Sequence, residues 1–402
     1  MTARVCFGMR RNHPAFFMVI DTIANRFGPR LRRLAAAVLA ILLVAAVPIL
    51  IAAGLAMRTG IEVDPNPGSQ GRNDVDLYQD MIAAVRSGQS YYVAVANAHR
   101  ADGYPLRPFV TVRPPLSAYA LSILPNETWR EWSLMALTLV TLALWCRRLA
   151  DVAPNRVFFA LAVVLLSSGL GLTLSLVPYA LHESWAAVLI ALSLVVRQPN
   201  RFLPSVALGL VAALWRELSI PYLVAMAAMA WRDGQPREAR AFALAVVVAG
   251  AALAAHAWAV STVVVPGDAR SPGWLTIGGW QQVLRATNYN ALLLLLPAWV
   301  VAVTTPLALF GLTAARGPVG RRLALIVFGY AFAFMILGRE NNHYWGVMIA
   351  PLLPLGLLYL PDAIDTCAKA VRGLSDDERS AAPEAPSQAS PGGAPPATLA
   401  CL

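Results

Sequence analysis

The stretch that decides the fold is residues 34–57, LAAAVLAILLVAAVPILIAAGLAM, which follows the basic segment 29–33, PRLRR. It carries no charge and is long enough to cross a hydrocarbon core of about 30 Å as a helix. It is also longer than the apolar region of a cleaved signal peptide, so we interpret it as a retained signal anchor. By the positive-inside rule, the arginines before it predict a cytoplasmic N-terminus. Met1 and Met18 both fit as the start of the chain.

The composition agrees with a protein that lies mostly within a membrane. The chain has 402 residues, of which 58% are hydrophobic and 13% charged, against about 25% charged residues in soluble proteins. Apolar runs recur up to residue 360. The sequence therefore predicts an all-α polytopic protein of the plasma (inner) membrane, with about ten transmembrane helices and with both termini in the cytoplasm.

The net charge of +10 comes almost entirely from arginine, since Lys369 is the only lysine. The arginines are spread over short loops and form no dense patch, which excludes a nucleic-acid partner. The four cysteines, Cys6, Cys146, Cys367 and Cys401, are far apart and show neither a metal-binding spacing nor a disulfide framework.

Three regions are expected along the chain. They are a basic cytoplasmic segment (1–33), a transmembrane domain (34–360) and a largely disordered cytoplasmic tail (361–402). Two extracytoplasmic loops are expected at 58–128 and 266–288. In the first loop, Leu77, Met81, Ile82 and Val85 share one face of a short surface helix that ends near Gly88. A pair of short helices, 202–215 and 218–231, is expected to place Arg216 and Glu217 at its tip.

Asp74 and Asp76 lie in the first of these loops, immediately after the first apolar span. Asp76 fits the N-cap of the surface helix, and Asp74 fits the positive end of the same helix. The functional interpretation is that one carboxylate is a general base that removes a proton from an acceptor hydroxyl. The other carboxylate then orients the acceptor or binds a divalent ion through its oxygen atoms.

The remaining unusual polar residues fall on the same predicted face of the membrane. Charged groups inside a bilayer cost about 2.5–3.5 kcal/mol each even on lenient scales, so their convergence predicts a polar cavity. The candidates for contacting a substrate or its phosphate are Arg113, His182, Glu183, Arg216, Glu217, Arg339, Glu340 and His343.

Each candidate also has a structural interpretation, which the sequence leaves open. Arg113 fits an interfacial arginine as well as a phosphate ligand. His182-Glu183 fits a helix start as well as a substrate or metal contact. Arg216-Glu217 fits a self-satisfied ion pair as well as a guanidinium aimed at a phosphate. The run 339–345, RENNHYW, fits an outer turn with an aromatic belt as well as a second phosphate or sugar contact. His256, on an apolar helix, is interpreted as a packing residue.

Three motifs resemble those of the GT-C superfamily of integral membrane glycosyltransferases. Residues 73–78, NDVDLY, resemble the acidic motif of that family's first extracytoplasmic loop. Residues 113–116, RPPL, are similar to the segment that closes this loop, and residues 214–217, LWRE, are similar to a short hairpin with a basic residue facing the active site. The resemblance covers roughly residues 34–360.

The resemblance implies inverting transfer of a sugar from a polyprenyl-phosphate donor to a hydroxyl of a lipid, glycan or protein. Asp74 matches the position of the catalytic base, with Asp76 less suited to that role. Membrane lipids are the surrounding partners and no cofactor is implied, although a divalent cation stays open. Larger members carry an outer soluble domain after the last span, and its absence from this sequence leaves the acceptor open.

Two other functions compete with this one. A transporter or flippase of lipid-linked saccharides would also be polytopic, but such proteins show inverted repeats and polar groups near the midplane. A catalytically inactive relative that binds the lipid-linked sugar without turnover is the third possibility.

Overall fold

The computed structural model describes residues 29–57, 74–176 and 179–381 of the chain. The structure is 78% helix, and the described residues form no β-strand, only three isolated β-bridges. The expected all-helical class is therefore confirmed. The predictions for residues 1–28, for Asn73, for Cys6 and Cys401, and for the tail beyond residue 381 lie outside the described residues.

The segment that follows the first apolar helix is itself helical over most of its described length. Apolar residues of α3, including Leu77, Met81 and Ile82, are buried against α4 and α5, so the expected amphipathic helix faces protein on its apolar side. It ends before Gly88, whose φ of +89° favours glycine. The elements are α3 (Asp74–Arg86), α4 (Tyr91–Ala101), η1 (Phe109–Thr111) and α5 (Leu116–Ser122).

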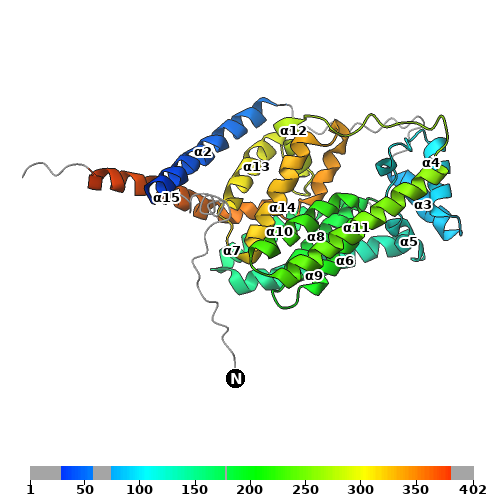
Figure 1. Ribbon diagram of the computed structural model, residues 1–402, viewed down its shortest axis with the longest axis horizontal. Coiled ribbons are helices and arrows are strands. Elements are labelled where there is room, and N and C mark those ends of the chain that lie inside the picture. Colours follow the sequence, from blue (N-terminus) through cyan, green and yellow to red (C-terminus); the bar gives the residue numbers. More distant parts are fainter. Residues whose placement is uncertain (1–28, 58–73, 177–178, 382–402) are drawn as a thin grey trace, which may run out of the picture.

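Two expectations for this segment need correction. A long loop at 58–128 is not confirmed, because the described part of that range consists largely of the four helices of the α3–α5 unit. The expected N-cap role of Asp76 is wrong, since α3 already includes Asp74 and places Asp76 within its first turn. The α3–α5 unit lies at one end of the molecule, in cyan at the right of Figure 1.

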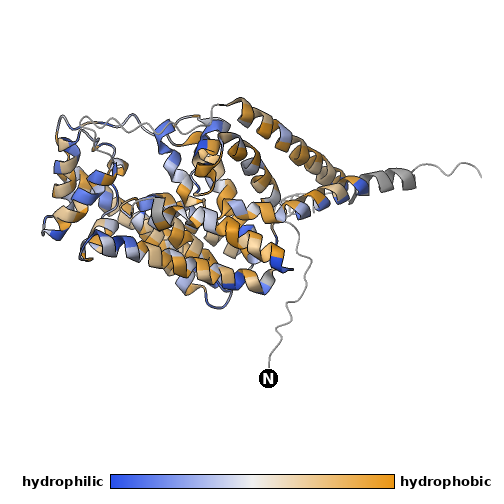
Figure 2. Cartoon of the chain, turned by 180° about the vertical axis from the view of Figure 1, so that it is seen from behind, coloured by the Kyte–Doolittle hydropathy of each residue, from blue (hydrophilic) through white to orange (hydrophobic). Residues whose placement is uncertain are grey.

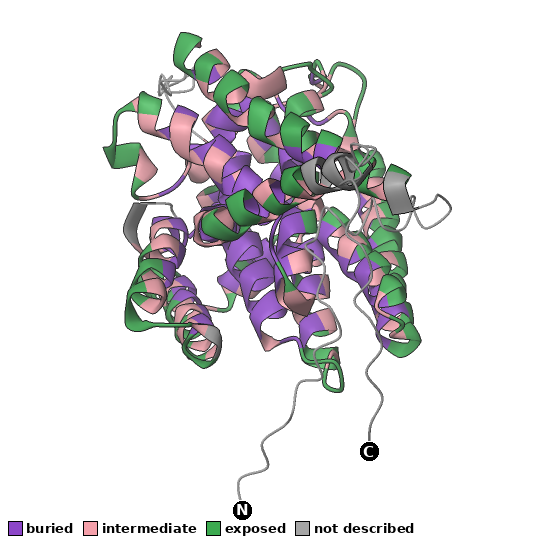
Figure 3. Cartoon of the chain, turned by 90° about the vertical axis from the view of Figure 1, so that its left-hand side faces the viewer, coloured by how far each residue is buried: buried purple, intermediate pink, exposed green. Residues whose placement is uncertain are grey.

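The centre of the molecule is built around α8. Every residue of α8 from His182 to Val195 is buried, as expected of a helix that is apolar all round. It packs against α6 and α9, and Figure 3 shows the buried residues gathered in the interior. The elements of this region are α6 (Glu127–Val152), α7 (Arg156–Leu170), a π-helical segment η2 (Leu172–Leu176), α8 (His182–Val196), α9 (Leu203–Trp215), η3 (Glu217–Ser219), α10 (Ile220–Arg232) and α11 (Pro236–Val263).

The C-terminal part packs against the first helix of the chain. Helix α2 (Pro29–Ala56) contacts α13 and α15, at the end of the molecule opposite the α3–α5 unit (Figure 1). The tail expected at 361–402 is thus wrong in its first part, because α15 is helical there and buries Ala363 and Cys367. The elements are α12 (Gly279–Thr287), η4 (Leu293–Leu295), α13 (Ala298–Leu312), α14 (Gly317–Ile336), η5 (Glu340–Met348), η6 (Leu353–Tyr359) and α15 (Leu360–Ala381).

Ten membrane spans are not confirmed. Four described helices are long and apolar enough to cross a bilayer, namely Leu31–Ala56, Glu127–Asp151, Pro236–Val263 and Gly317–Ile336, and the bent pair Glu340–Met348 with Leu353–Gly373 would add a fifth. The other expected spans are shorter helices. A helix of 15 residues such as α8 rises only about 22 Å, less than the bilayer core. In Figure 2, hydrophobic residues nevertheless occupy much of the helices, in keeping with the four or five candidate spans among the described residues.

A buried ion cluster ties the helices together where α8 ends. Arg197 donates two hydrogen bonds of 2.6 Å to Glu238, and neither side chain is more than 2% exposed. Arg322 donates to Asp233 at 2.7 Å and lies 3.7 Å from the Glu238 carboxylate. We call these four residues the basic-end cluster. It joins α8, α10, α11 and α14, and it lies about 20 Å along α8 from His182.

A close contact sets the position of η5. A Cβ atom at Gly346 would lie 1.7 Å from the carbonyl oxygen of Ala286, so only glycine allows η5 to approach α12 this closely. The residues before it, Tyr344 and Trp345, are directed by the same short helix toward the start of α8, which η5 also contacts.

Candidate functional site

Arg113 is held by two tyrosines. It follows η1, and Tyr91 donates a hydrogen bond of 2.7 Å to its backbone carbonyl oxygen. Its Nε atom donates to the Tyr78 hydroxyl at 2.9 Å, and Nη2 donates to the Tyr344 hydroxyl at 3.4 Å. Within the described residues, no carboxylate lies within 4 Å of its nitrogen atoms. The charge of this half-buried arginine is therefore not paired with an acid.

The two phenols do not supply the missing negative charge. Burial raises the pKa of the Tyr78 hydroxyl well above its usual value of 10.0. The Arg113 guanidinium lowers this pKa, and the Asp74 carboxylate raises it. A neutral phenol accepts a hydrogen bond from arginine but does not neutralise it. Arg113 therefore remains a cation open to an anionic ligand.

Arg216, in contrast, is fully paired. It stands where α9 ends, with an extended backbone (φ −146°, ψ 114°) that separates α9 from η3. Its Nε donates to Glu183 Oε1 at 2.6 Å, and Nη1 donates to Glu217 Oε1. Arg216 is 1% exposed and Glu183 fully buried. The ion pair that the sequence left open is therefore present, and it includes Glu183 from the start of α8.

His182 and Ser117 form a buried contact beside these arginines. His182 Nε2 lies 2.7 Å from the Ser117 hydroxyl, which brings the start of α8 against α5. The Tyr78 ring stands edge-on to His182 with the ring centroids 4.6 Å apart. Tyr78 thus connects Arg113 and His182, and the helix-start interpretation of His182-Glu183 is compatible with a place in this site.

Asp74 and Asp76 face different ways on α3. Asp74 is one turn before Tyr78 and so shares its face of the helix, and its charge acts on both Tyr78 and Tyr344, the two phenols that hold Arg113. Asp76 is two residues further on, about 200° around the helix axis from Asp74. The structure therefore puts Asp74, and not Asp76, on the face of α3 that carries Tyr78.

Three of the expected substrate contacts lie elsewhere. The Arg339 guanidinium lies 5.6 Å from the centroid of Trp274. Glu340 is 85% exposed and pairs with Arg285 at 2.8 Å. His343 donates from Nδ1 to the Glu340 carbonyl oxygen and contacts the Tyr289 ring. The structure gives these side chains partners in other parts of the chain and does not join them to the arginines.

From the same run, two residues that sequence reasoning did not select reach the site. Tyr344 contacts Arg113, and the Trp345 ring centroid lies 6.0 Å from the Arg216 guanidinium. Tyr78 and Ser117 were also missed. Tyr78 could have been selected from the sequence, because its spacing of four residues places it on the same helix face as Asp74. Nothing in the sequence around Ser117 pointed to a place in this site.

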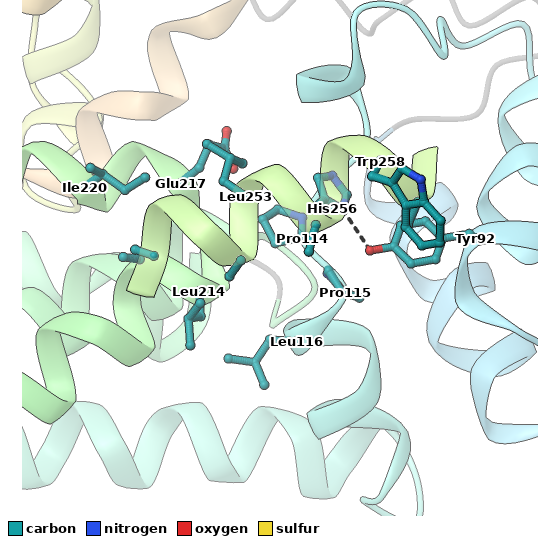
Figure 4. A pocket seen from close by; sticks show the side chains of 15 residues that line it. Tyr92, Pro114, Pro115, Leu116, Leu214, Glu217, Ile220, Leu253, His256 and Trp258 are labelled. Carbon is teal, nitrogen blue, oxygen red and sulfur yellow. Dashed lines mark hydrogen bonds between the residues drawn. The ribbon is translucent and has the colours of Figure 1, made fainter. Parts of the chain in front are cut away.

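An apolar cavity of about 440 Å³ adjoins this cluster. It is bounded by Pro114, Pro115 and Leu116, by the end of α9, and by α11 from Ala249 to Ala259 (Figure 4). Its polar wall residues are Tyr92, His256 and Glu217. Neither arginine lines the cavity, but Pro114 directly follows Arg113 in the chain and Glu217 is bonded to Arg216.

His256 is a packing residue, as expected. Its Nε2 donates to the Val112 carbonyl oxygen at 3.0 Å, so Nδ1 must accept the hydrogen bond of 3.1 Å from the Tyr92 hydroxyl that Figure 4 marks. Both ring nitrogens are thereby satisfied. His256 holds the segment before Arg113 against α11 and so shapes one wall of the cavity.

Buried polar atoms without a partner are concentrated around Arg216. Of the fourteen such side-chain atoms in the described residues, seven belong to residues 182–184, 215–219 and 345. Buried polar groups in folded proteins are almost always hydrogen-bonded, so a local concentration of unsatisfied ones points to water or a ligand at that place. The three interacting parts are called here the arginine site: the Arg113 group with Tyr78 and Tyr344, the Arg216 group with Glu183 and Glu217, and Asp74.

The chain was compared with protein-family models, with curated proteins and with solved structures, and none of them matches it.

Proposed function

We propose that this protein is a membrane glycosyltransferase that moves a sugar from a polyprenyl-phosphate donor to a hydroxyl acceptor, with Arg113 binding the donor phosphate. The observation that carries the proposal is a guanidinium without an acid partner, next in the chain to Pro114, which lines an apolar cavity. Arginine is suited to phosphate because its planar donors match two phosphate oxygens. Arg216 is less suited, since Glu183 and Glu217 already occupy it.

The apolar cavity supports a lipid-linked donor. Its walls are mostly alanine, leucine, isoleucine and proline, and Trp258 stands at its rim. A ligand whose phosphate is bound by Arg113 would place the first isoprene units beside Pro114 and Leu116. Each buried CH₂ contributes about 0.8 kcal/mol, so even a short part of such a chain adds substantial affinity.

The chemistry assigns one role to Asp74. The acceptor hydroxyl gives its proton to the Asp74 carboxylate, and the acceptor oxygen attacks the anomeric carbon from the side opposite the phosphate. The bond between that carbon and the phosphate oxygen breaks, and its electron pair leaves with the polyprenyl phosphate. Arg113 stabilises the negative charge that develops there, and the configuration of the sugar is inverted.

We also propose an orientation of the protein in the plasma membrane. The basic-end cluster and the neighbouring arginines 147, 148, 201, 232 and 237 are taken to face the cytoplasm, by the positive-inside rule. The arginine site, at the other end of α8, then opens on the outer side of the plasma membrane. A donor delivered on the outer leaflet would reach the cavity between α9 and α11 from the lipid.

The test is sugar transfer by the purified protein in nanodiscs, with radiolabelled polyprenyl-phosphate hexoses and extracted envelope lipids and glycans as acceptors. Asp74→Asn is expected to lose transfer by a factor of about 10²–10⁴, the usual contribution of a general base, and Asp76→Asn is the matched control on another face of α3. A glycan and lipid profile of a deletion strain names the sugar and the acceptor. Full activity of Asp74→Asn would exclude Asp74 as the base, and movement of the lipid-linked sugar across proteoliposomes without transfer would favour a flippase.

A further inference from the structure

The Arg216 group carries one negative charge in excess. A single guanidinium binds two carboxylates, Glu183 and Glu217, and Arg216 and Glu183 are both almost completely buried. The next cation on which these carboxylates act is Arg113. In the ligand-free protein, the positive charge of Arg113 therefore offsets part of this excess at long range, without an ion pair.

A bound phosphate changes this balance. The step rests on the proposed function, in which Arg113 neutralises the phosphate of the donor. The excess carboxylate of the Arg216 group then has no positive partner, and Asp74 adds a further negative charge nearby. An unpaired buried charge is unfavourable. The ligand that brings the phosphate must therefore also bring a positively charged group that pairs with this carboxylate.

The structure shows which carboxylate oxygen atoms lack a hydrogen-bond partner. Oε1 of each glutamate is bonded to Arg216, whereas Oε2 of Glu183 and Oε2 of Glu217 are buried and have no hydrogen-bond partner. A carboxylate oxygen accepts hydrogen bonds and donates none. Glu217 and Pro114 both line the cavity, as Figure 4 shows, so a ligand in the cavity can reach the Glu217 carboxylate.

We infer that Glu217 Oε2, supported by Glu183, forms a subsite for a protonated amino group on the sugar of the donor. An ammonium group supplies both the hydrogen-bond donors and the positive charge that the two carboxylates lack. Mg²⁺ or Ca²⁺ fits less well, because these ions take six or more oxygen ligands and Arg216 already occupies one oxygen of each carboxylate. The site would thus bind a phosphate and an ammonium group of the same ligand.

The test is equilibrium binding of three matched ligands to the full-length protein in nanodiscs, without any acceptor. The ligands are a polyprenyl-phosphate hexose, the same compound with a free amino group in place of one hydroxyl, and the N-acetylated amino compound. Binding is followed by tryptophan fluorescence, since Trp345 lies against Arg216. The amino compound is expected to bind at least tenfold more tightly than the other two, because acetylation keeps an N–H donor but removes the charge.

The variant Glu217→Gln separates the possible outcomes. It is expected to weaken binding of the amino compound about tenfold and so to abolish the preference. The hydroxyl compound should bind at least as tightly as to the native protein, because the variant removes a negative charge that opposes the phosphate. Glu340→Gln is the matched control, since Glu340 is an exposed carboxylate bonded to another arginine. Thermal unfolding of each variant reports whether it is folded.

Three results would overturn the inference. Equal affinity for the three ligands in the native protein shows that the carboxylates do not bind an amino group of the ligand, and it leaves the proposed function standing. Affinity that depends on added Mg²⁺ and is lost with a chelator assigns the carboxylates to a metal ion. Failure of all three ligands to bind removes the proposed function, and the inference with it.

Discussion

Replacement of Arg113 tests the central assignment of charge. Two of the five N–H groups of Arg113 are used by Tyr78 and Tyr344, and Nη1 has no hydrogen-bond partner among the described residues. Nη1 and the second hydrogen of Nη2 are therefore available to two oxygen atoms of a phosphate. A hydrogen bond to a charged group contributes about 1.5–3 kcal/mol, and each 1.4 kcal/mol is a factor of ten in Kd.

The expected change in Kd for each Arg113 variant follows from the number of hydrogen bonds to the phosphate that the variant loses. Arg113→Lys keeps the charge but loses the two-pronged geometry, so the Kd for a polyprenyl-phosphate hexose should rise about 10- to 150-fold, equivalent to one such bond. Arg113→Gln loses the charge as well, and its Kd should rise about 10²- to 10⁴-fold. The assay is equilibrium binding in nanodiscs, with thermal unfolding to confirm that each variant is folded.

Two controls isolate the role of the guanidinium. Tyr344→Phe removes the hydrogen bond to Nη2 but keeps the charge. Because this bond is present both before and after the ligand binds, its loss largely cancels, and the Kd should change by less than about threefold. Arg339→Gln removes an arginine that lies against Trp274 and should leave Kd unchanged. The reasoning is refuted if Arg113→Gln binds the donor like the native protein, or if Tyr344→Phe reproduces the whole effect.

Further predictions concern stability and the cavity. Glu238→Gln leaves Arg197 buried without its acid, which should cost about 3–5 kcal/mol and lower Tm by roughly 4–7 °C; an unchanged Tm in a scan at fixed rate would contradict this. Burial lowers the pKa of His99 to about 4, so the folded protein holds His99 neutral while the unfolded chain takes up a proton below about pH 6.5. Stability should therefore fall by up to about 3 kcal/mol between pH 6.5 and 4, and His99→Gln should flatten this part of a stability curve measured by denaturant titration. Leu253→Trp fills the cavity and should weaken donor binding about tenfold, whereas Val247→Trp, on the exposed face of the same helix, should not; equal effects of the two would place the lipid chain outside the cavity.

Local features of the sequence account for the helical class and for several helix ends. The low charge and the long apolar runs allow little else than buried or membrane helices. Glycine at position 88 and the polar pair at 216–217 mark real breaks, because these residues favour a turn or interrupt an apolar face. Ten spans are not confirmed, since a run of apolar residues gives no information on whether it crosses a bilayer or stays a short helix inside the protein.

The sequence by itself determined which residues carry unusual charge, and only the tertiary structure decided which of these charges are already paired. Arg216 and Arg113 look alike in the sequence, each beside an apolar stretch. The chain brings Glu183 from 33 positions away to Arg216, whereas it brings two neutral tyrosines, 35 and 231 positions away, to Arg113. The same folding turns Arg339, Glu340 and His343 to other partners. Pairing depends on contacts between distant segments, and local periodicity does not contain them.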